Sequence, residues 1–255
     1  MNRLLLVTVV LIVIFGSVSA DEIHLRSDPW CPYTCDPASD KPGILVEVAQ
    51  AIFEKAGHTV VYKTMNWARA IQETRKGTFD GLLGPYKSDA PGFIFPEEPV
   101  LESRMCFFVK ESDPWTYEGY DSLQGRSISV INNYSYGDAF DAYILENRNK
   151  GAGTIQTLAG GNAGQRRIKL VALGRIDTIL EDWLVFPNQV KARQGMAELK
   201  KIKGFRMAGF LSEEGSYIAF SPNKTSSQGY ADLVSAGIRQ MRQSGELEKI
   251  VDKYR

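Results

Sequence analysis

The stretch LGRIDTILEDW, residues 173–183, combines the local signals that decide the fold. Its apolar residues alternate with polar ones, which predicts a half-buried strand. Gly174 can end a preceding helix in the left-handed conformation, and Asp177 can stabilise the turn into the strand. The strand then leads to two adjacent carboxylates, Glu181 and Asp182. The stretch therefore predicts a helix, a turn and a strand that ends in acidic residues.

An earlier stretch, KGTFDGLLGPY at residues 76–86, repeats the same order of glycine, apolar residue, aspartate and apolar strand. We assign structural roles to Asp80 and Asp177, because aspartate in this position stabilises the turn. In open α/β sheets, ligands bind beyond the carboxyl ends of the strands. That rule selects 84–86 and 181–183 as the candidate site.

Helical and strand patterns alternate along the chain, which predicts an α/β protein with helices covering a largely parallel sheet. The alternation breaks and restarts near residue 103. We therefore expect two α/β lobes, one formed by residues 21–109 and 215–255 and the other by residues 110–214. The chain is expected to cross between them at about 108–112 and at about 211–217.

The first twenty residues have a basic start at Arg3, an apolar core and a small-residue ending at Ala20. This is the pattern of a secretory signal peptide, with cleavage expected after Ala20 and export to the periplasm. A membrane anchor is the alternative, but the apolar run of roughly 12 residues is shorter than the ~20 that a spanning helix needs. The remaining chain is nearly neutral, so there is no electrostatic case for nucleic acid.

Export makes a disulfide between Cys31 and Cys35 plausible, with two free thiols as the alternative. Cys106 lies in an apolar run and is expected to be a buried thiol. The two histidines, His24 and His58, do not form a metal-spaced pair. We therefore expect no metal and no cofactor.

Four segments, in this order, make the chain resemble the periplasmic solute-binding proteins of the polar amino-acid type, bacterial extracellular family 3: WARAIQETRKGTFDGLLG (67–84), FPEEPV (95–100), GRIDTILED (174–182) and the closing segment at 233–255. The resemblance implies a two-lobed type II periplasmic-binding-protein fold, with two crossing strands as the hinge. It also implies a monomer that captures a small polar ligand by lobe closure. Such a protein delivers its ligand to an inner-membrane ABC permease or presents it to a membrane receptor.

The same resemblance assigns ligand contacts in the second lobe. The residue matching Asp182 receives the ligand's ammonium group, although capping of the following helix is an alternative role for Asp182 or Glu181. Asn133, Tyr134 and Ser135 match the turn that holds the ligand's acidic end at a helix N-terminus. We read the loop before Arg166 and Arg167 as mobile and these arginines as solvated.

Aromatic residues are candidates for the first-lobe side of the cleft, because an aromatic face can hold an apolar body or a cation. Trp30 and Tyr33 follow the first strand, Trp67 starts a helix, and Tyr86 follows Gly84 at a strand end. Ordinary core packing is the alternative for each aromatic residue.

One departure from the resembled pattern bears on the ligand. Asp89 stands where members that bind α-amino acids carry an arginine for the α-carboxylate. Lys87 could supply a charge but not the planar two-point contact of arginine. We therefore predict a small, polar, amine-bearing ligand that is amino-acid-like, and a modified amino acid, a polyamine-like compound and a small peptide remain open as alternatives.

An enzymatic alternative is a dehydratase resembling cyclohexadienyl dehydratase, with Glu181 and Asp182 as an acid–base pair. Adjacent residues on a strand point to opposite faces, which argues against a facing pair. We therefore predict that the chain is not an enzyme.

Overall fold

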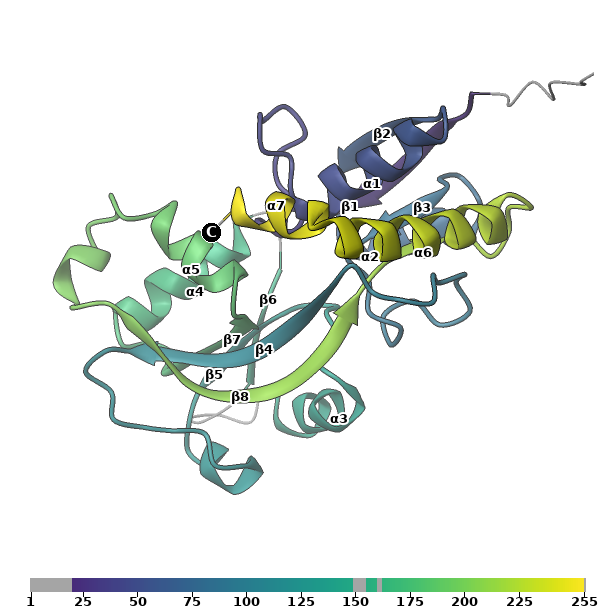
Figure 1. Cartoon of the computed structure of the whole chain (residues 1–255). Coiled ribbons are helices and arrows are strands. Elements are labelled where there is room, and N and C mark those ends of the chain that lie inside the picture. Colours follow the sequence, from purple (N-terminus) through teal and green to yellow (C-terminus); the bar gives the residue numbers. More distant parts are fainter. Residues whose placement is uncertain (1–19, 149–154, 160–161, 255) are drawn as a thin grey trace, which may run out of the picture.

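The computed structural model describes residues 20–148, 155–159 and 162–254, which form two lobes, each built on its own sheet (Figure 1). The predicted signal peptide lies, up to Ser19, outside the described residues. None of the helices that the structure describes is both long and apolar enough to cross a membrane.

The first lobe contains a sheet in the order β2-β1-β3-β9. β1 (Glu22–Ser27) pairs in parallel with β2 (Thr59–Thr64) and β3 (Gly81–Leu83), and β9 (Ile218–Phe220) is antiparallel to β3. The helices of this lobe are α1 (Ile44–Lys55), α2 (Trp67–Arg75), α6 (Ser227–Ser244) and α7 (Glu246–Asp252). The apolar face of α1 is buried in the core at Leu45, Val48 and Ile52.

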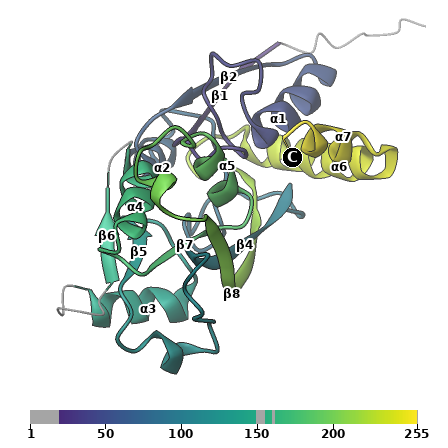
Figure 2. The ribbon, with the colours of Figure 1, turned by 90° about the vertical axis from the view of Figure 1, so that its left-hand side faces the viewer.

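The second lobe contains a sheet in the order β6-β5-β7-β4-β8. Its parallel strands are β5 (Ile128–Ile131), β6 (Ile155–Leu158) and β7 (Thr178–Asp182). Its helices are α3 (Asp138–Asn147), α4 (Ala163–Ala172) and α5 (Val185–Lys191), with short 3-10 turns at Tyr120–Leu123 and Leu199–Lys201. Figure 2 shows the two lobes with β4 and β8 crossing between them.

Two long antiparallel strands, β4 (Leu101–Lys110) and β8 (Phe205–Ser216), connect the lobes. β4 also pairs with β7, from Met105 to Phe108, so its carboxyl half already belongs to the second sheet. The expected crossings, at about 108–112 and about 211–217, fall at the carboxyl ends of β4 and β8.

The repeated glycine–aspartate pattern has the same geometry in both lobes. Gly77 and Gly174 have φ angles of 87° and 70°, in the left-handed region that suits glycine. The Asp80 carboxylate accepts the His24 backbone N–H at 2.7 Å, and the Asp177 carboxylate accepts the Ser127 backbone N–H at 2.9 Å. Each aspartate thus ties its turn to the neighbouring strand, which confirms the predicted structural roles.

Candidate ligand-binding site

The ends of the parallel strands face each other across the interlobe cleft, and two adjoining cavities lie there. The smaller cavity has a volume of about 20 Å³, room for about one water molecule. It is lined by Ser27, Asp28, Trp30, Trp67, Leu83, Gly84, Tyr86, Asp89, Tyr134 and Ser135. The larger cavity has a volume of about 420 Å³ and shares Asp28, Trp30, Trp67 and Tyr134 with the smaller one. A small ligand therefore fits the larger cavity and can reach the smaller one.

Most of the predicted site residues line these cavities. Trp30, Gly84 and Tyr86 come to the smaller cavity from the strand ends of the first lobe, and Ser135 comes from the turn before α3. Asn133 lines the larger cavity, together with uncharged polar side chains from both lobes, namely Thr64, Asn66, Asn132 and Gln189. Such side chains can hold hydroxyl, amide or amine groups.

Tyr33 and Lys87 lie outside the linings of both cavities. Tyr33 is fully buried, and its ring stacks on that of Trp30 with the centroids 4.3 Å apart. The Tyr33 side chain therefore packs against the Trp30 indole and does not face either cavity. Lys87 is exposed, with its ammonium nitrogen 5.2 Å from the centre of the Tyr217 ring.

Asp182 is fully buried and also lies outside both linings. One carboxylate oxygen, Oδ1, accepts the backbone N–H groups of Leu184 and Val185 at 2.8 and 3.1 Å. The other, Oδ2, accepts the hydroxyls of Tyr33 and Ser103 and the backbone N–H of Arg104. Asp182 thus accepts backbone N–H groups at the start of α5, which agrees with the alternative role of capping that helix. Both of its carboxylate oxygens have hydrogen-bond partners within the protein.

The neighbouring acid, Glu181, lines the larger cavity. Its Oε1 accepts the Trp30 indole N–H at 3.3 Å across the cleft, and its Oε2 accepts a hydrogen bond from the Arg167 guanidinium. The prediction that Arg167 is solvated is wrong, because Arg167 is fully buried in this ion pair. The two acids serve different partners, and no described hydrogen bond joins their side-chain oxygens.

Asp28, which the sequence analysis missed, lines both cavities. It directly follows β1, so the strand-end rule that selected residues 84–86 would have found it. Its carboxylate accepts the Tyr134 hydroxyl of the other lobe. Burial raises the pKa of Asp28 to about 6, and the nearby Glu181 charge adds to the rise.

Asp89 lines the smaller cavity from the position where an arginine was expected. Its carboxylate accepts the backbone N–H of Tyr86 at 3.0 Å and, across the cleft, that of Ser135 at 3.2 Å. Burial raises the pKa of Asp89 to about 7. Within residues 20–148, 155–159 and 162–254, no cationic side chain forms an ion pair with Asp28 or Asp89.

The cleft therefore has a strongly acidic character. No lysine, arginine or histidine of the described residues lines either cavity, whereas Asp28, Asp89 and Glu181 do. The described chain also holds no group of three or more histidine, cysteine, aspartate or glutamate side chains that could bind a metal ion.

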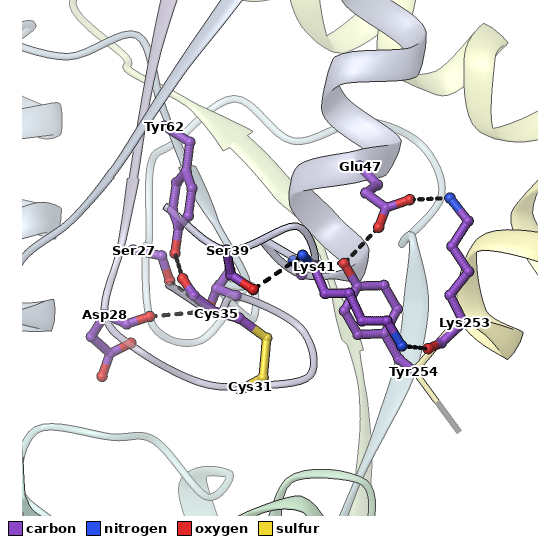
Figure 3. Close-up of a disulfide and its surroundings, with 12 residues drawn as sticks. Ser27, Asp28, Cys31, Cys35, Ser39, Lys41, Glu47, Tyr62, Lys253 and Tyr254 are labelled. Carbon is purple, nitrogen blue, oxygen red and sulfur yellow. Dashed lines mark hydrogen bonds and ion pairs between the residues drawn. A yellow bond between two sulfur atoms is a disulfide. The ribbon is translucent and has the colours of Figure 1, made fainter. Parts of the chain in front are cut away.

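A disulfide between Cys31 and Cys35, as predicted, closes a short loop directly after Trp30 (Figure 3). The Tyr62 hydroxyl donates to the Cys35 carbonyl at 3.0 Å, and the Thr34 hydroxyl donates to the Asp28 carbonyl at 3.0 Å. The loop is thus fixed to β2 and to the end of β1. Cys106 is a free, buried thiol, as expected, and burial raises its pKa to about 11.

The C-terminal residues hold the segment that follows this loop. The Tyr254 hydroxyl accepts the Gly43 backbone N–H at 2.8 Å and donates to Glu47 at 2.6 Å, and Lys41 donates to the Lys253 carbonyl (Figure 3). Because α1 starts at Ile44, directly after Gly43, the contacts of Lys253 and Tyr254 also hold the start of this helix in place.

The family model of bacterial extracellular solute-binding proteins, family 3, matches residues 26–255. No curated protein matches the sequence.

Three solved structures illustrate the likeness in fold. An amino acid ABC transporter substrate-binding protein from Streptococcus pneumoniae, bound to L-arginine, superposes with a TM-score of 0.69 at 17% identity, covering 91% of this chain and 94% of its own. A protein of glutathione import in Streptococcus mutans gives a TM-score of 0.73 at 15% identity, covering 92% and 95%. A histidine kinase sensor domain with similarity to periplasmic binding proteins gives 0.71 at 20%, covering 91% and 95%. At these identities the likeness establishes the fold alone.

Proposed function

The chain belongs to the bacterial extracellular solute-binding proteins of family 3, and on this premise we propose that it captures a small, amine-bearing cation between its lobes. The mechanism is closure of the lobes about β4 and β8, which changes the shape of the protein without chemistry on the ligand. The protein then delivers the solute to a membrane transporter. Export through residues 1–20, with cleavage after Ala20, would place it in the periplasm.

The unpaired carboxylates of the cleft carry this proposal. A carboxylate removed from water is costly unless a cation compensates its charge. Asp28 and Asp89 are partly buried, and the described protein offers them hydrogen bonds but no cationic partner. A ligand ammonium or guanidinium group would supply the missing charge through charge-assisted hydrogen bonds. The indoles of Trp30 and Trp67 give the same cation an aromatic face.

A thermal-shift screen of amines, amino acids, peptides and organic acids tests the proposal, because a ligand that binds only the folded protein raises its melting temperature. We expect cations to raise it and anions to have no effect. Asp28→Asn should weaken the best cation by about 10–100-fold, since it removes one charge-assisted contact and keeps the side-chain shape.

Glu22→Gln is the matched control for Asp28→Asn, because it removes the same charge at the exposed opposite end of β1. This variant should bind like the original protein. Stabilisation by anions only would refute the cation proposal, and so would equal losses in the two variants. Mass spectrometry of the ligand after incubation should recover it unchanged, whereas conversion of prephenate or arogenate would support the dehydratase alternative.

The affinity for the cation should depend on pH. Asp28 and Asp89 have pKa values of about 6 and about 7, so both are largely protonated at about pH 5 and ionised at about pH 8. Because a cation binds the ionised forms, its affinity should rise roughly tenfold or more between these limits. Titration calorimetry in buffers of matched ionic strength would measure this rise, and Asp28→Asn should flatten it. A constant or falling affinity would contradict the prediction.

The unliganded protein should show the opposite trend. In the folded protein these two carboxyl groups have raised pKa values and bind more protons than in the unfolded chain. Their contribution to stability is therefore complete below about pH 4, the pKa of aspartate in the unfolded chain, and is lost as pH rises from there through about 6 to 7. The contribution of these two groups to the melting temperature without ligand should therefore fall from about pH 4 to about pH 7, a range that overlaps the rise in affinity for the cation.

Presentation of the closed form to a membrane receptor is the second candidate function. The likeness in fold to a histidine kinase sensor domain favours it. Uptake of the labelled ligand by cells with and without the gene would separate the two, since only delivery to a transporter requires the protein for uptake.

A further inference from the structure

The turn before α3 is where a ligand's acidic end was expected to bind, and its backbone N–H groups from Tyr134 to Gly137 already have acceptors. Ser135 N–H donates to Asp89 at 3.2 Å, and Tyr136 N–H donates to Asp141 at 2.9 Å. Tyr134 N–H donates to the Ile131 carbonyl, and Gly137 N–H donates to the Ser135 hydroxyl at 3.3 Å. The chain's own acceptors therefore fill this position.

Two of these acceptors are carboxylates that come from different lobes. Asp141 belongs to α3 itself and also accepts the Ser135 hydroxyl at 2.7 Å. Asp89 reaches the same turn from the first lobe, where its other oxygen accepts Tyr86 N–H. A ligand carboxylate bound at this turn would bridge the two lobes by accepting hydrogen bonds from both of them. Asp89 makes that bridge from within the protein.

A ligand carboxylate would have to displace Asp89 and would then lie beside Asp141. Burial is the main cause of the raised pKa of Asp89, and the charges of Glu214 and Asp141 add to it. Neither cavity offers a compensating lysine or arginine from the described residues, and Lys87 lies on Tyr217 outside both linings. Repulsion between these aspartates and a ligand carboxylate would exclude solutes that carry a carboxylate.

From this geometry we propose that Asp89 determines specificity by taking the place of a ligand carboxylate, so that the protein selects amines that carry no carboxylate. The inference rests on the proposed capture of a cation and narrows its chemistry. Amines obtained by decarboxylation of basic amino acids have this character, and the parent amino acids do not.

Matched pairs of compounds test the inference by titration calorimetry on the full mature chain. The pairs are agmatine with arginine, cadaverine with lysine and putrescine with ornithine, each differing by one carboxylate. In at least one pair the amine should bind about tenfold or more tightly than its amino acid. Equal or tighter binding of the amino acid in every pair that binds would overturn the inference and leave the proposed cation capture intact. Absence of binding by all six compounds would overturn both.

Asp89→Ser tests the residue itself, because it removes the charge and frees Ser135 N–H. The amine-to-amino-acid affinity ratio should fall by about tenfold or more. Asp121→Asn, an exposed second-lobe residue, is the charge-matched control and should keep the original ratio. Asp89→Asn preserves the side-chain shape and replaces the serine variant if that variant unfolds. An unchanged ratio in a folded Asp89 variant would overturn the role of this residue.

Discussion

Replacing Arg167 with methionine should lower the free energy of unfolding by about 3–5 kcal/mol, because it leaves a buried carboxylate without its cation. Arg167 and Glu181 are 0% and 2% exposed at their side chains and form an ion pair. The guanidinium also donates to the Leu180 carbonyl at 3.0 Å. Methionine retains most of the apolar stem, so the loss comes mainly from the charge and the hydrogen bonds.

Arg166→Met is a closely matched control, since Arg166 is the preceding residue on α4 and is exposed. It should change the free energy of unfolding by no more than about 0.5 kcal/mol. Urea denaturation of both variants would measure the difference. Similar losses in the two variants would contradict the buried ion pair.

The double variant Arg167→Met with Glu181→Gln gives a further check on the same pair. Neutralising Glu181 should recover part of the loss, because the main cost of removing Arg167 is the unpaired charge of its partner. Additive losses would show that packing, and not charge, explains the effect of the single variant. Glu181 also accepts the Trp30 indole N–H, so complete recovery is not expected.

The sequence predicts well those features that depend on short segments. Gly77 and Gly174 end helices because a left-handed residue favours glycine wherever it occurs. The Cys31–Cys35 bond was expected from two thiols four residues apart in a chain with the pattern of an exported protein. The rule that ligands bind at strand ends selects the region of the two cavities, and Trp30 and Tyr134, two of the candidate residues, line both of them.

Features that depend on contacts distant in sequence were predicted less well. The sequence near Arg167 is rich in glycine and polar residues, which suggests an exposed loop, but its partner Glu181 lies on β7 and buries it. Alternation along a strand separates two adjacent acids without telling which one faces the cleft. That choice follows from the pairing of β7 with β4, in which Asp182 lies opposite Met105 and next to the Ser103 hydroxyl.

Asp89 illustrates the same limit in another way. The sequence alone shows that residue 89 is an aspartate and not the expected arginine. The bridge to Ser135 N–H, however, depends on how close the two lobes lie. The absence of the arginine can be read from the sequence. The contact by which Asp89 takes the place of a ligand carboxylate, as proposed above, can be found only in the folded structure.

Asp182→Ala should also cost about 3–5 kcal/mol of unfolding free energy. The variant removes the acceptor at the start of α5 and leaves several buried donors without a partner. Asp182→Asn should cost less, because its remaining oxygen can still accept the backbone N–H groups of Leu184 and Val185. Urea denaturation of both variants, with Asp121→Ala as an exposed control, would measure these differences.

Ligand affinity separates this structural role from direct contact with the ligand. If Asp182 acts through α5 and the interlobe contacts, folded Asp182→Asn should bind the cation within a few-fold of the original protein. Asp28→Asn should show the reverse pattern, with nearly unchanged stability and a 10–100-fold weaker affinity, about the loss of one charge-assisted contact. A large loss of affinity in Asp182→Asn at unchanged stability would instead indicate that Asp182 contacts the ligand's ammonium group directly. The lobes would then have to open far enough to expose a carboxylate that Tyr33 and Ser103 now cover.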